Sequence, residues 1–295
     1  MSLSIRDLTE VRARHPEAVA EAAARRARRP LIGVSGRLMI VAADHPARGA
    51  LGAGARRFAM ANRRDLLERL CTALSRPGVD GVLATADVLE DLLLLGVLEN
   101  KVVMGSMNRG GLAGSAFEMD DRFTGHRAED IARLRFDAGK LLLRIDYDDP
   151  GSLTTLESTA RAVDAMAGHG LPVFVEPFIS RRVGGRVRND LSAEAVTRSI
   201  AIASGLGGTS AYTWLKLPVT EDPDDMGEVL ETSMLPAVLL GGDTGGSPGD
   251  QAAAYERWRK ALRLPTVRGL VAGRSLLYPA RGSVEEAVDT AVGLL

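Results

Sequence analysis

The stretch from Lys140 to Phe178, KLLLRIDYDDPGSLTTLESTARAVDAMAGHGLPVFVEPF, contains the pattern that decides the fold. It begins with the apolar run Lys140–Asp146, continues through Leu153–Ala167, where apolar residues recur at helical spacing, and ends with the apolar run Pro172–Phe178. Runs with so few polar residues are typical of strands in a parallel sheet that is covered by helices. We therefore predict a strand, a helix and a second strand parallel to the first.

The same alternation extends over most of the chain, at a period of roughly 30 to 40 residues that is typical of βα units. The predicted strands are Leu38–Asp44, Val79–Ala84, Val102–Ser106, Lys140–Asp146, Pro172–Phe178, Tyr212–Pro218, Ala237–Gly241 and Arg268–Gly273. The predicted helices include Arg64–Leu74, Asp87–Leu95, Ala128–Phe136, Leu153–Ala167, Ala193–Ala203, Met226–Leu235, Gln251–Leu262 and Val284–Leu295. Eight such units predict an α/β fold of the closed (β/α)₈ TIM barrel type rather than an open doubly wound sheet.

We predict a single domain, because no Pro/Ser-rich linker or abrupt change in composition divides the chain. In this prediction residues 1–30 are an N-terminal helical extension and residues 31–295 are the barrel. The segment Ile5–Arg29 has the pattern of an amphipathic helix that is interrupted at Pro16, and it either caps the bottom of the barrel or starts the outer ring of helices. The basic cluster Arg25–Arg29 is interpreted as a solvated helix end rather than a binding site.

The composition narrows the class of function. Of the 295 residues 45% are hydrophobic and 25% are charged, as in a soluble globular protein, and 37 Lys and Arg against 38 Asp and Glu leave no basic excess for nucleic-acid binding. The longest apolar run, Val88–Leu98, is too short to span a membrane, and Met1–Glu10 lacks the apolar stretch of a signal peptide. The single Cys71 cannot form an intrachain disulfide, which favours a cytoplasmic location.

Charged residues stand inside or at the end of four predicted strands. They are Asp44, Lys140, Glu176 and Lys216. Active sites of TIM barrels form at the C-terminal ends of the strands, where alternate side chains point inward, so we expect these four groups to converge. Buried charges are costly unless they are paired. The set is therefore either an ion network that fills the mouth of the barrel or a catalytic site.

The use of lysine at two of these positions favours catalysis. Only four of the 37 basic residues are lysines, at Lys101, Lys140, Lys216 and Lys260, which leaves 33 arginines. An ion network could have used arginine, which keeps its proton. A lysine in an apolar strand beside another ammonium group has a lowered pKa, and its neutral amine attacks a carbonyl carbon to form an imine. Lys216 beside Lys140 is the predicted pair.

The ends of the last two predicted strands favour an anion-binding site. The stretches Leu239–Gly246 and Leu270–Ser275 contain Gly241, Gly242, Gly273 and Arg274. Glycines let backbone N–H groups approach an oxyanion, and arginine supplies a forked donor. Barrel enzymes often bind a substrate phosphate at these two loops. The alternative is that the glycines only serve tight turns.

Several of these segments resemble class I, Schiff-base aldolases of the tagatose-bisphosphate and sulfofructose-phosphate type, which are related to deoxyribose-phosphate and archaeal-type fructose-bisphosphate aldolases. The resemblance extends from Leu38 to Tyr278. Its most specific segments are Asp137–Leu143, Val175–Pro177, Trp214–Pro218 and Ala272–Arg274. The pair Asp44-His45 is closer to the Asp-His of the archaeal-type enzymes than to the tagatose-type sequence, so the substrate is not carried over.

The resemblance implies a role for each predicted site residue. Lys216 would form the imine, Lys140, Glu176 and Asp44 would surround it, and the phosphate would be held by Gly241, Gly242, Gly273 and Arg274. The implied activity is that of a lyase which reversibly cleaves a carbon–carbon bond in a phosphorylated ketose or keto-acid, in carbohydrate or inositol catabolism, without a cofactor. Either Glu176 or Asp44 is the proton shuttle, and the closeness of Glu176 to strand six favours Glu176. Aldolases of this type frequently assemble, which implies a homo-oligomer.

Two other functions stay open. A barrel of this kind could bind a phosphosugar without catalysis, because fold alone does not secure activity. A metal-dependent aldolase would need more ligands than the four histidines offer, since among His15, His45, His126 and His169 only His45 lies at a predicted strand end.

Two loops have two interpretations each. The loop from Met107 to His126 is either a lid over the active site or a simple connection, with His126 as a proton donor or as a surface residue at a helix start. The arginine-rich loop Arg181–Arg188 either binds a second anionic end of the substrate or is solvated.

Overall fold

A closed barrel of parallel strands forms the centre of the computed structural model, which describes residues 3–242 and 247–295. The eight barrel strands of this part of the chain are β1 (Leu38–Ala42), β2 (Gly81–Ala84), β3 (Val102–Ser106), β4 (Ala138–Ile145), β5 (Val173–Val183), β7 (Thr213–Leu217), β8 (Ala237–Leu240) and β9 (Val267–Ala272). Each pairs in parallel with the next, and β9 pairs with β1 to close the ring. The predicted (β/α)₈ TIM barrel is therefore confirmed.

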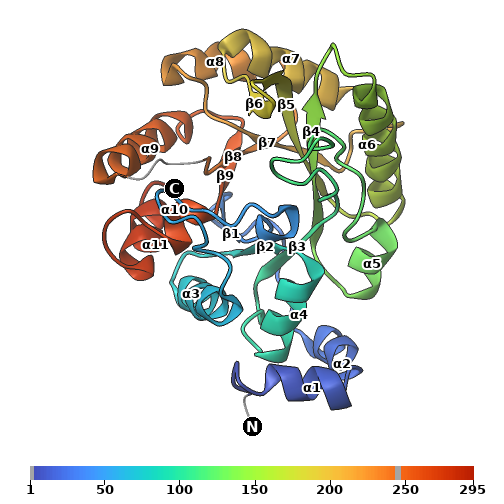
Figure 1. Ribbon diagram of the computed structural model, residues 1–295, viewed down its shortest axis with the longest axis vertical. Helices are drawn as coiled ribbons and strands as arrows, with labels where there is room; N and C mark the ends of the chain where they lie inside the picture. The colour runs from blue at the N-terminus through green and yellow to red at the C-terminus, as the bar shows by residue number, and fades with distance from the viewer. Residues whose placement is uncertain (1–2, 243–246) are drawn as a thin grey trace.

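Helices surround this barrel (Figure 1). In chain order they are α1 (Leu8–Arg14), α2 (Ala18–Arg25), α3 (Arg63–Ser75), α4 (Ala86–Leu94), α5 (Ala128–Arg133), α6 (Gly151–Gly168), α7 (Ala193–Ser204), α8 (Met226–Leu230), α9 (Pro248–Ala261), α10 (Arg274–Leu277) and α11 (Val284–Val292), with short 3₁₀ turns η1 (Pro46–Arg48) and η2 (Pro223–Asp225). Several begin at a capping side chain: Ser192 accepts the Ala195 N–H at the start of α7. The chain breaks at Pro16 as predicted, whereas α5 and α8 are shorter than their predicted ranges.

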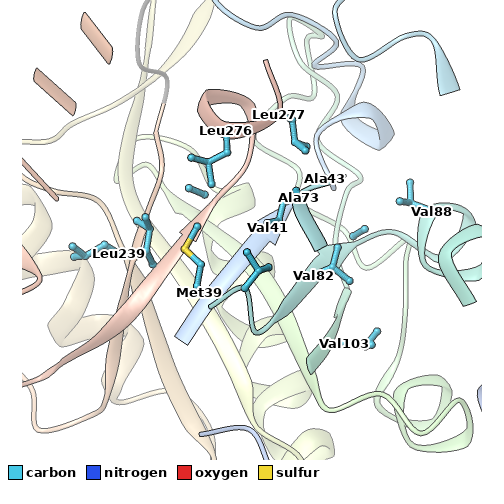
Figure 2. Close-up of a cluster of buried hydrophobic side chains, with 14 of the residues drawn as sticks. Met39, Val41, Ala43, Ala73, Val82, Val88, Val103, Leu239, Leu276 and Leu277 are labelled. Carbon is cyan, nitrogen blue, oxygen red and sulfur yellow. The ribbon is translucent and has the colours of Figure 1, made fainter. Parts of the chain in front are cut away.

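The strands divide their side chains between two apolar layers. Outward-facing residues such as Met39, Val41 and Val82 pack against the helices, as Figure 2 shows for the region around β1. Inward-facing residues such as Ile40 and Phe174 form a second layer inside the barrel. This division follows from the two-residue period of a strand, and it places Asp44, two residues after Ala42, above the inner layer.

The inner layer also explains Trp214. Its ring stacks on Phe174 inside the barrel, with ring centroids 5.1 Å apart. Leu31 and Ile32, from the segment between α2 and β1, pack against the same layer. The interior is thus filled with apolar side chains below the level at which the charged residues begin.

Part of the basic cluster Arg25–Arg29 is a correction to the sequence interpretation. Arg26 is only 1% exposed, and its guanidinium donates to the Lys101 and Arg135 carbonyl oxygens and to Asp137. Arg28 also pairs with Asp137, at 2.8 Å. Arg26 and Arg28 therefore tie the N-terminal segment to the bottom of the barrel, at the start of β4, whereas Arg25, the last residue of α2, is exposed as predicted.

The loop Arg181–Arg188 forms a β-hairpin, which the sequence analysis did not predict. β5 runs on to Val183, turns at Gly184 and Gly185, and pairs antiparallel with β6 (Arg186–Asn189). Both glycines have a positive φ, 57° and 77°, which a tight two-residue hairpin turn requires. The Gly-Gly pair between alternating residues was the signal that could have predicted it.

Candidate active site at the C-terminal ends of the strands

A cavity of about 620 Å³ opens at the C-terminal ends of the barrel strands. It is lined by all eight residues predicted for the site, namely Asp44, Lys140, Glu176, Lys216, Gly241, Gly242, Gly273 and Arg274. Its volume lies within the range of about 300–1,000 Å³ that is usual for small-molecule sites. The sequence thus predicted which groups gather here, while their chemical roles stay predictions. The rest of the glycine-rich stretch, residues 243–246, lies outside the described residues.

The strands position the four charged groups by their inward alternation. Lys140 follows Ala138 on the inner face of β4, and Glu176 follows Phe174 on β5. Lys216 likewise follows Trp214 on β7, which is the sixth barrel strand. The side chains of Lys140, Lys216 and Glu176 are 1%, 7% and 11% exposed. Asp146, two residues after Arg144, lies beyond the end of β4, where its carboxylate accepts the Asp148 N–H at 3.1 Å.

Glu176 lies between the two lysine amines. The Lys216 Nζ donates to its Oε1, and the Lys140 Nζ forms an ion pair with its Oε2. Lys140 also donates to Asp44 Oδ2 at 3.4 Å. The expected pair of lysines is thus bridged by a carboxylate. The charges are paired, which the ion-network interpretation predicts. They also line an open cavity, which the catalytic interpretation predicts.

Arg109 is a site residue that the sequence analysis missed. It is buried, its Nη2 donates to Asp44 Oδ2, and its Nε donates to Ser106 Oγ at 3.0 Å. Ser106 in turn donates to the same Asp44 oxygen at 3.0 Å. Ser106 ends β3 and Arg109 follows three residues later, so polar residues directly after a predicted strand were the available signal.

The loop after β3 is held over the barrel by its own polar groups. Asn108 exchanges two hydrogen bonds with the backbone of Leu142, at 2.6 and 2.7 Å, as a neighbouring strand would. His126, at the end of this loop, is buried rather than at the surface, with its ring edge-on to Phe136 at 5.5 Å between centroids. Its Nδ1 lies 3.3 Å from the Ser106 carbonyl oxygen. His126 is therefore a core residue outside the barrel wall, and the surface interpretation was wrong.

Burial and neighbouring charges set the protonation of the cavity. Burial lowers the pKa of Lys140, and Arg109 lowers it further, to about 8, against the opposing effects of Asp44 and Glu176. Burial opposes the ionisation of Glu176, but Lys140 and Lys216 together hold its pKa at about 2. Burial also opposes the ionisation of Asp44, yet Arg109 and Lys140 keep its pKa well below the usual range. Both carboxylates are therefore ionised at neutral pH.

His45 is neutral in this environment. Burial lowers its pKa to about 3, and although Asp44 opposes this change, Arg274 reinforces it. Its Nδ1 lies 3.9 Å from Asp44 Oδ1, and the residue lines the cavity. A neutral imidazole at this place can donate or accept a hydrogen bond from a substrate hydroxyl group.

Backbone geometry explains why glycine occurs at the ends of β8 and β9. A Cβ atom on Gly273 would lie 2.1 Å from the Ala42 carbonyl oxygen, so the approach of β9 to β1 requires glycine there. Gly242 has a φ of 63°, which also favours glycine. Close packing and turn geometry thus account for the residue type, while both positions still face the cavity.

Two further features bear on the other predicted functions. Within residues 3–242 and 247–295, no three His, Cys, Asp or Glu side chains are grouped so that they could hold a metal ion. The metal-dependent alternative therefore has no ligand set in this part of the chain. Among the helices of the same residues, none combines the length and the hydropathy that crossing a bilayer requires.

The strand order and the cavity at the C-terminal strand ends define the protein as a (β/α)₈ TIM barrel. A Schiff base-forming fructose-1,6-bisphosphate aldolase is 20% identical, with a TM-score of 0.66 over 94% of this chain and 99% of that one. An archaeal fructose-1,6-bisphosphate aldolase with its catalytic Lys covalently bound to the carbinolamine intermediate is 19% identical, with a TM-score of 0.64 over 94% and 97%. At these identities the likeness shows the shared fold.

The chain belongs to the Cgl0159-like family, whose sequence profile matches residues 36–292. Cgl0159 from Corynebacterium glutamicum is 52% identical, with a TM-score of 0.93 over 98% of this chain and 95% of that one. No curated protein matches the sequence.

Proposed function

We propose that the chain is a class I aldolase in which Lys216 forms a Schiff base with the carbonyl carbon of a phosphorylated ketose or keto-acid. The observation that carries the proposal is the placement of the Lys216 amine against Glu176 at the wall of a 620 Å³ cavity, at the C-terminal end of a barrel strand. Here the buried amine has an ionised carboxylate within reach, which can accept the proton that the amine must lose before it attacks a carbonyl.

The reaction then uses the groups around Lys216 in turn. The neutral amine adds to the carbonyl carbon to form a carbinolamine, and Glu176 returns its proton to the carbinolamine hydroxyl group. Loss of water then leaves a protonated imine that withdraws electrons from the adjacent carbon–carbon bond, and Glu176 is again ionised. Glu176 removes the proton of the substrate hydroxyl group, the bond breaks, and an aldehyde leaves. The remaining enamine takes up this proton from Glu176 to give a second protonated imine, and its hydrolysis by water releases the second product from Lys216. In the reverse direction the same steps form the bond.

Asp44 and Lys140 orient this centre. Arg109 and Ser106 hold the Asp44 carboxylate in place, so Asp44 is suited to bind a substrate hydroxyl group, whereas Glu176 contacts the reacting amine directly. Lys140, with a pKa of about 8, can donate a hydrogen bond in either protonation state. The phosphate group would lie against Gly241, Gly242, Gly273 and Arg274, where the two loops after β8 and β9 border the cavity.

Trapping of the imine tests this function. Incubation with dihydroxyacetone phosphate and sodium borohydride should add the mass of the reduced adduct irreversibly to the peptide that contains Lys216. Because the chain has only four lysines, peptide mass mapping assigns the site without ambiguity. Lys260→Arg, which removes an exposed lysine, is the matched control and should be labelled like the wild type.

A phosphosugar-binding barrel without catalysis is the second candidate, because the paired state of Lys216 and Glu176 would also suit a static ion network. It predicts saturable binding of the same compound with no irreversible mass. Labelling that persists in Lys216→Arg would place the imine elsewhere and contradict the assignment.

A further inference from the structure

His45 is a cavity residue to which the proposed chemistry gives no role. It follows Asp44 after β1, and the next residue, Pro46, begins η1 and restricts the backbone there. The His45 side chain is 26% exposed and lines the cavity. A Cβ atom on Gly273 would lie 3.2 Å from the His45 Cε1 atom, so glycine directly after β9 leaves room for the imidazole ring. The ring therefore lies between Asp44 and the loop after β9.

Neither ring nitrogen of His45 has a hydrogen-bond partner in the part of the chain that the structure describes. Nδ1 is buried, and it lies 3.9 Å from Asp44 Oδ1, which is too far for a hydrogen bond. Because Nδ1 is enclosed by the protein while the residue lines the cavity, Nε2 is the nitrogen that a bound molecule can reach. A free polar atom at a cavity wall is suited to orient a ligand.

The two carboxylate oxygens of Asp44 differ in their partners. Oδ2 accepts hydrogen bonds from Ser106 Oγ at 3.0 Å, from Lys140 Nζ at 3.4 Å and from Arg109. Within residues 3–242 and 247–295, no hydrogen bond is made to Oδ1. The free oxygen of Asp44 is therefore the one on the side of His45 Nδ1.

The charge of Asp44 determines which nitrogen of His45 holds the proton. Burial lowers the pKa of His45 to about 3, so the ring is neutral at neutral pH and has one N–H group. A proton on Nδ1 is stabilised by the nearby carboxylate, whereas a lone pair there would be repelled by it. The neutral ring therefore has its proton on Nδ1. In this tautomer Nε2 has a lone pair and is a hydrogen-bond acceptor at the cavity wall.

We propose that His45 is a substrate-binding residue whose Nε2 accepts a hydrogen bond from a hydroxyl group of the substrate, with Asp44 holding the ring in the required tautomer. The inference rests on the proposed function, because the sugar-like substrate of an aldolase supplies hydroxyl groups near its carbonyl carbon. A compound that lacks the hydroxyl group leaves Nε2 without a donor and binds more weakly. His45 thus contributes to the selection of the substrate.

The tautomer of His45 is measured on the wild-type protein without a ligand. Long-range ¹H–¹⁵N NMR spectra of the protein with ¹⁵N-labelled histidine distinguish a protonated from an unprotonated ring nitrogen. The chain has four histidines, and the signals that disappear in His45→Gln belong to His45. We expect a protonated Nδ1 and an unprotonated Nε2. A proton on Nε2 would overturn the assignment of this nitrogen as an acceptor.

Three phosphorylated alcohols without a carbonyl group test hydroxyl recognition independently of imine formation. Racemic glycerol 3-phosphate has two hydroxyl groups, propane-1,2-diol 1-phosphate lacks the terminal one, and propane-1,3-diol 1-phosphate lacks the secondary one. NMR titration of the wild-type protein should show that at least one of these deletions weakens binding about fivefold or more, because Nε2 loses its donor. The deletion that does so identifies the hydroxyl group. Equal affinity for the three probes, or no binding of any of them, would overturn the proposal.

Variants at position 45 connect this preference to the imidazole. His45→Phe keeps a ring but removes the acceptor, so deletion of the hydroxyl group should no longer weaken binding. His45→Gln places an amide oxygen near the position of Nε2 and should restore part of the preference. Arg188→Gln is the matched control, because Arg188 lines the cavity from β6, is exposed, and should not affect the preference. An equal loss of affinity for all three probes in His45→Phe would reveal only a structural role and would contradict the proposal.

The outcome is separable from that of the proposed function. If the hydroxyl preference depends on His45 but borohydride traps no adduct, the binding role stands and the aldolase proposal falls. If Lys216 is trapped but the hydroxyl preference is missing, the role of His45 alone is refuted.

Discussion

The two ends of the barrel both contain buried ion pairs, but they use different cations. At the bottom, Arg26 and Arg28 share Asp137, and Arg29 pairs with Asp80. At the top, two lysines share Glu176 beside a cavity. Arginine keeps its proton and satisfies several acceptors at once, which suits a structural clamp. Lysine can lose its proton, so the same kind of pair at the open end becomes a site for proton transfer and covalent chemistry.

The largest expected effect is on the reaction rate at the top of the barrel, where the C-terminal strand ends lie. Lys216→Arg keeps a cation beside Glu176 but removes the nucleophile. We expect the exchange of deuterium from D₂O into dihydroxyacetone phosphate, which requires the enamine, to fall by at least about a thousandfold. NMR spectroscopy measures the exchange, and urea denaturation should show nearly unchanged stability. Deuterium exchange at the wild-type rate in Lys216→Arg would contradict the distinction between a structural end and a catalytic end of the barrel.

The next effect is at the bottom and concerns stability. Arg26→Met leaves Asp137 with Arg28 and the Val103 N–H as partners, and it removes the guanidinium group that donates to two backbone carbonyl oxygens. The free energy of unfolding should fall by about 3 kcal/mol, because one partner of a buried pair is removed. Urea denaturation measures it, while deuterium exchange by the folded variant should be unaffected. Arg25→Met, on an exposed pair with Glu21, is the control and should change stability by less than about 0.5 kcal/mol.

The smallest effect is the pH dependence that only the lysine end should show. The pKa of Lys140 is lowered from 10.5 to about 8 in the folded chain, so between these values the unfolded chain holds the proton that the folded chain has lost. Stability should therefore rise with pH across this window in the wild type relative to Lys140→Met. The difference in stability between Arg26→Met and the wild type should not change with pH in this window, because arginine keeps its proton throughout it.

Direct titration sharpens the same comparison. NMR of lysine labelled with ¹⁵N at Nζ gives one resonance for each of the four lysines, and Arg109→Gln should move the pKa of Lys140 upward because a nearby cation is removed. An unchanged Lys140 titration in that variant would show that Arg109 does not control the protonation of the site.

Much of the architecture was predictable because it depends on local periodicity. Apolar runs separated by helical patterns indicated the eight barrel strands, and their alternation indicated that Lys140, Glu176 and Lys216 face inward. The ends of the elements were less predictable, since β5 continues as a hairpin and Asp44 lies just beyond β1. The burial and pairing of Arg26 were not predictable, because its acceptor Asp137 lies 111 residues away in the chain.

The sequence by itself determined which side chains point into the barrel, because a strand turns alternate residues to the same face whatever it pairs with. Only the tertiary structure decided which charges meet. Glu176 lies between two amines, Arg109 donates a hydrogen bond to Asp44, and Arg188 lines the cavity. These contacts depend on the closure of the barrel and on the paths of the loops, because both bring together residues that are far apart in the chain.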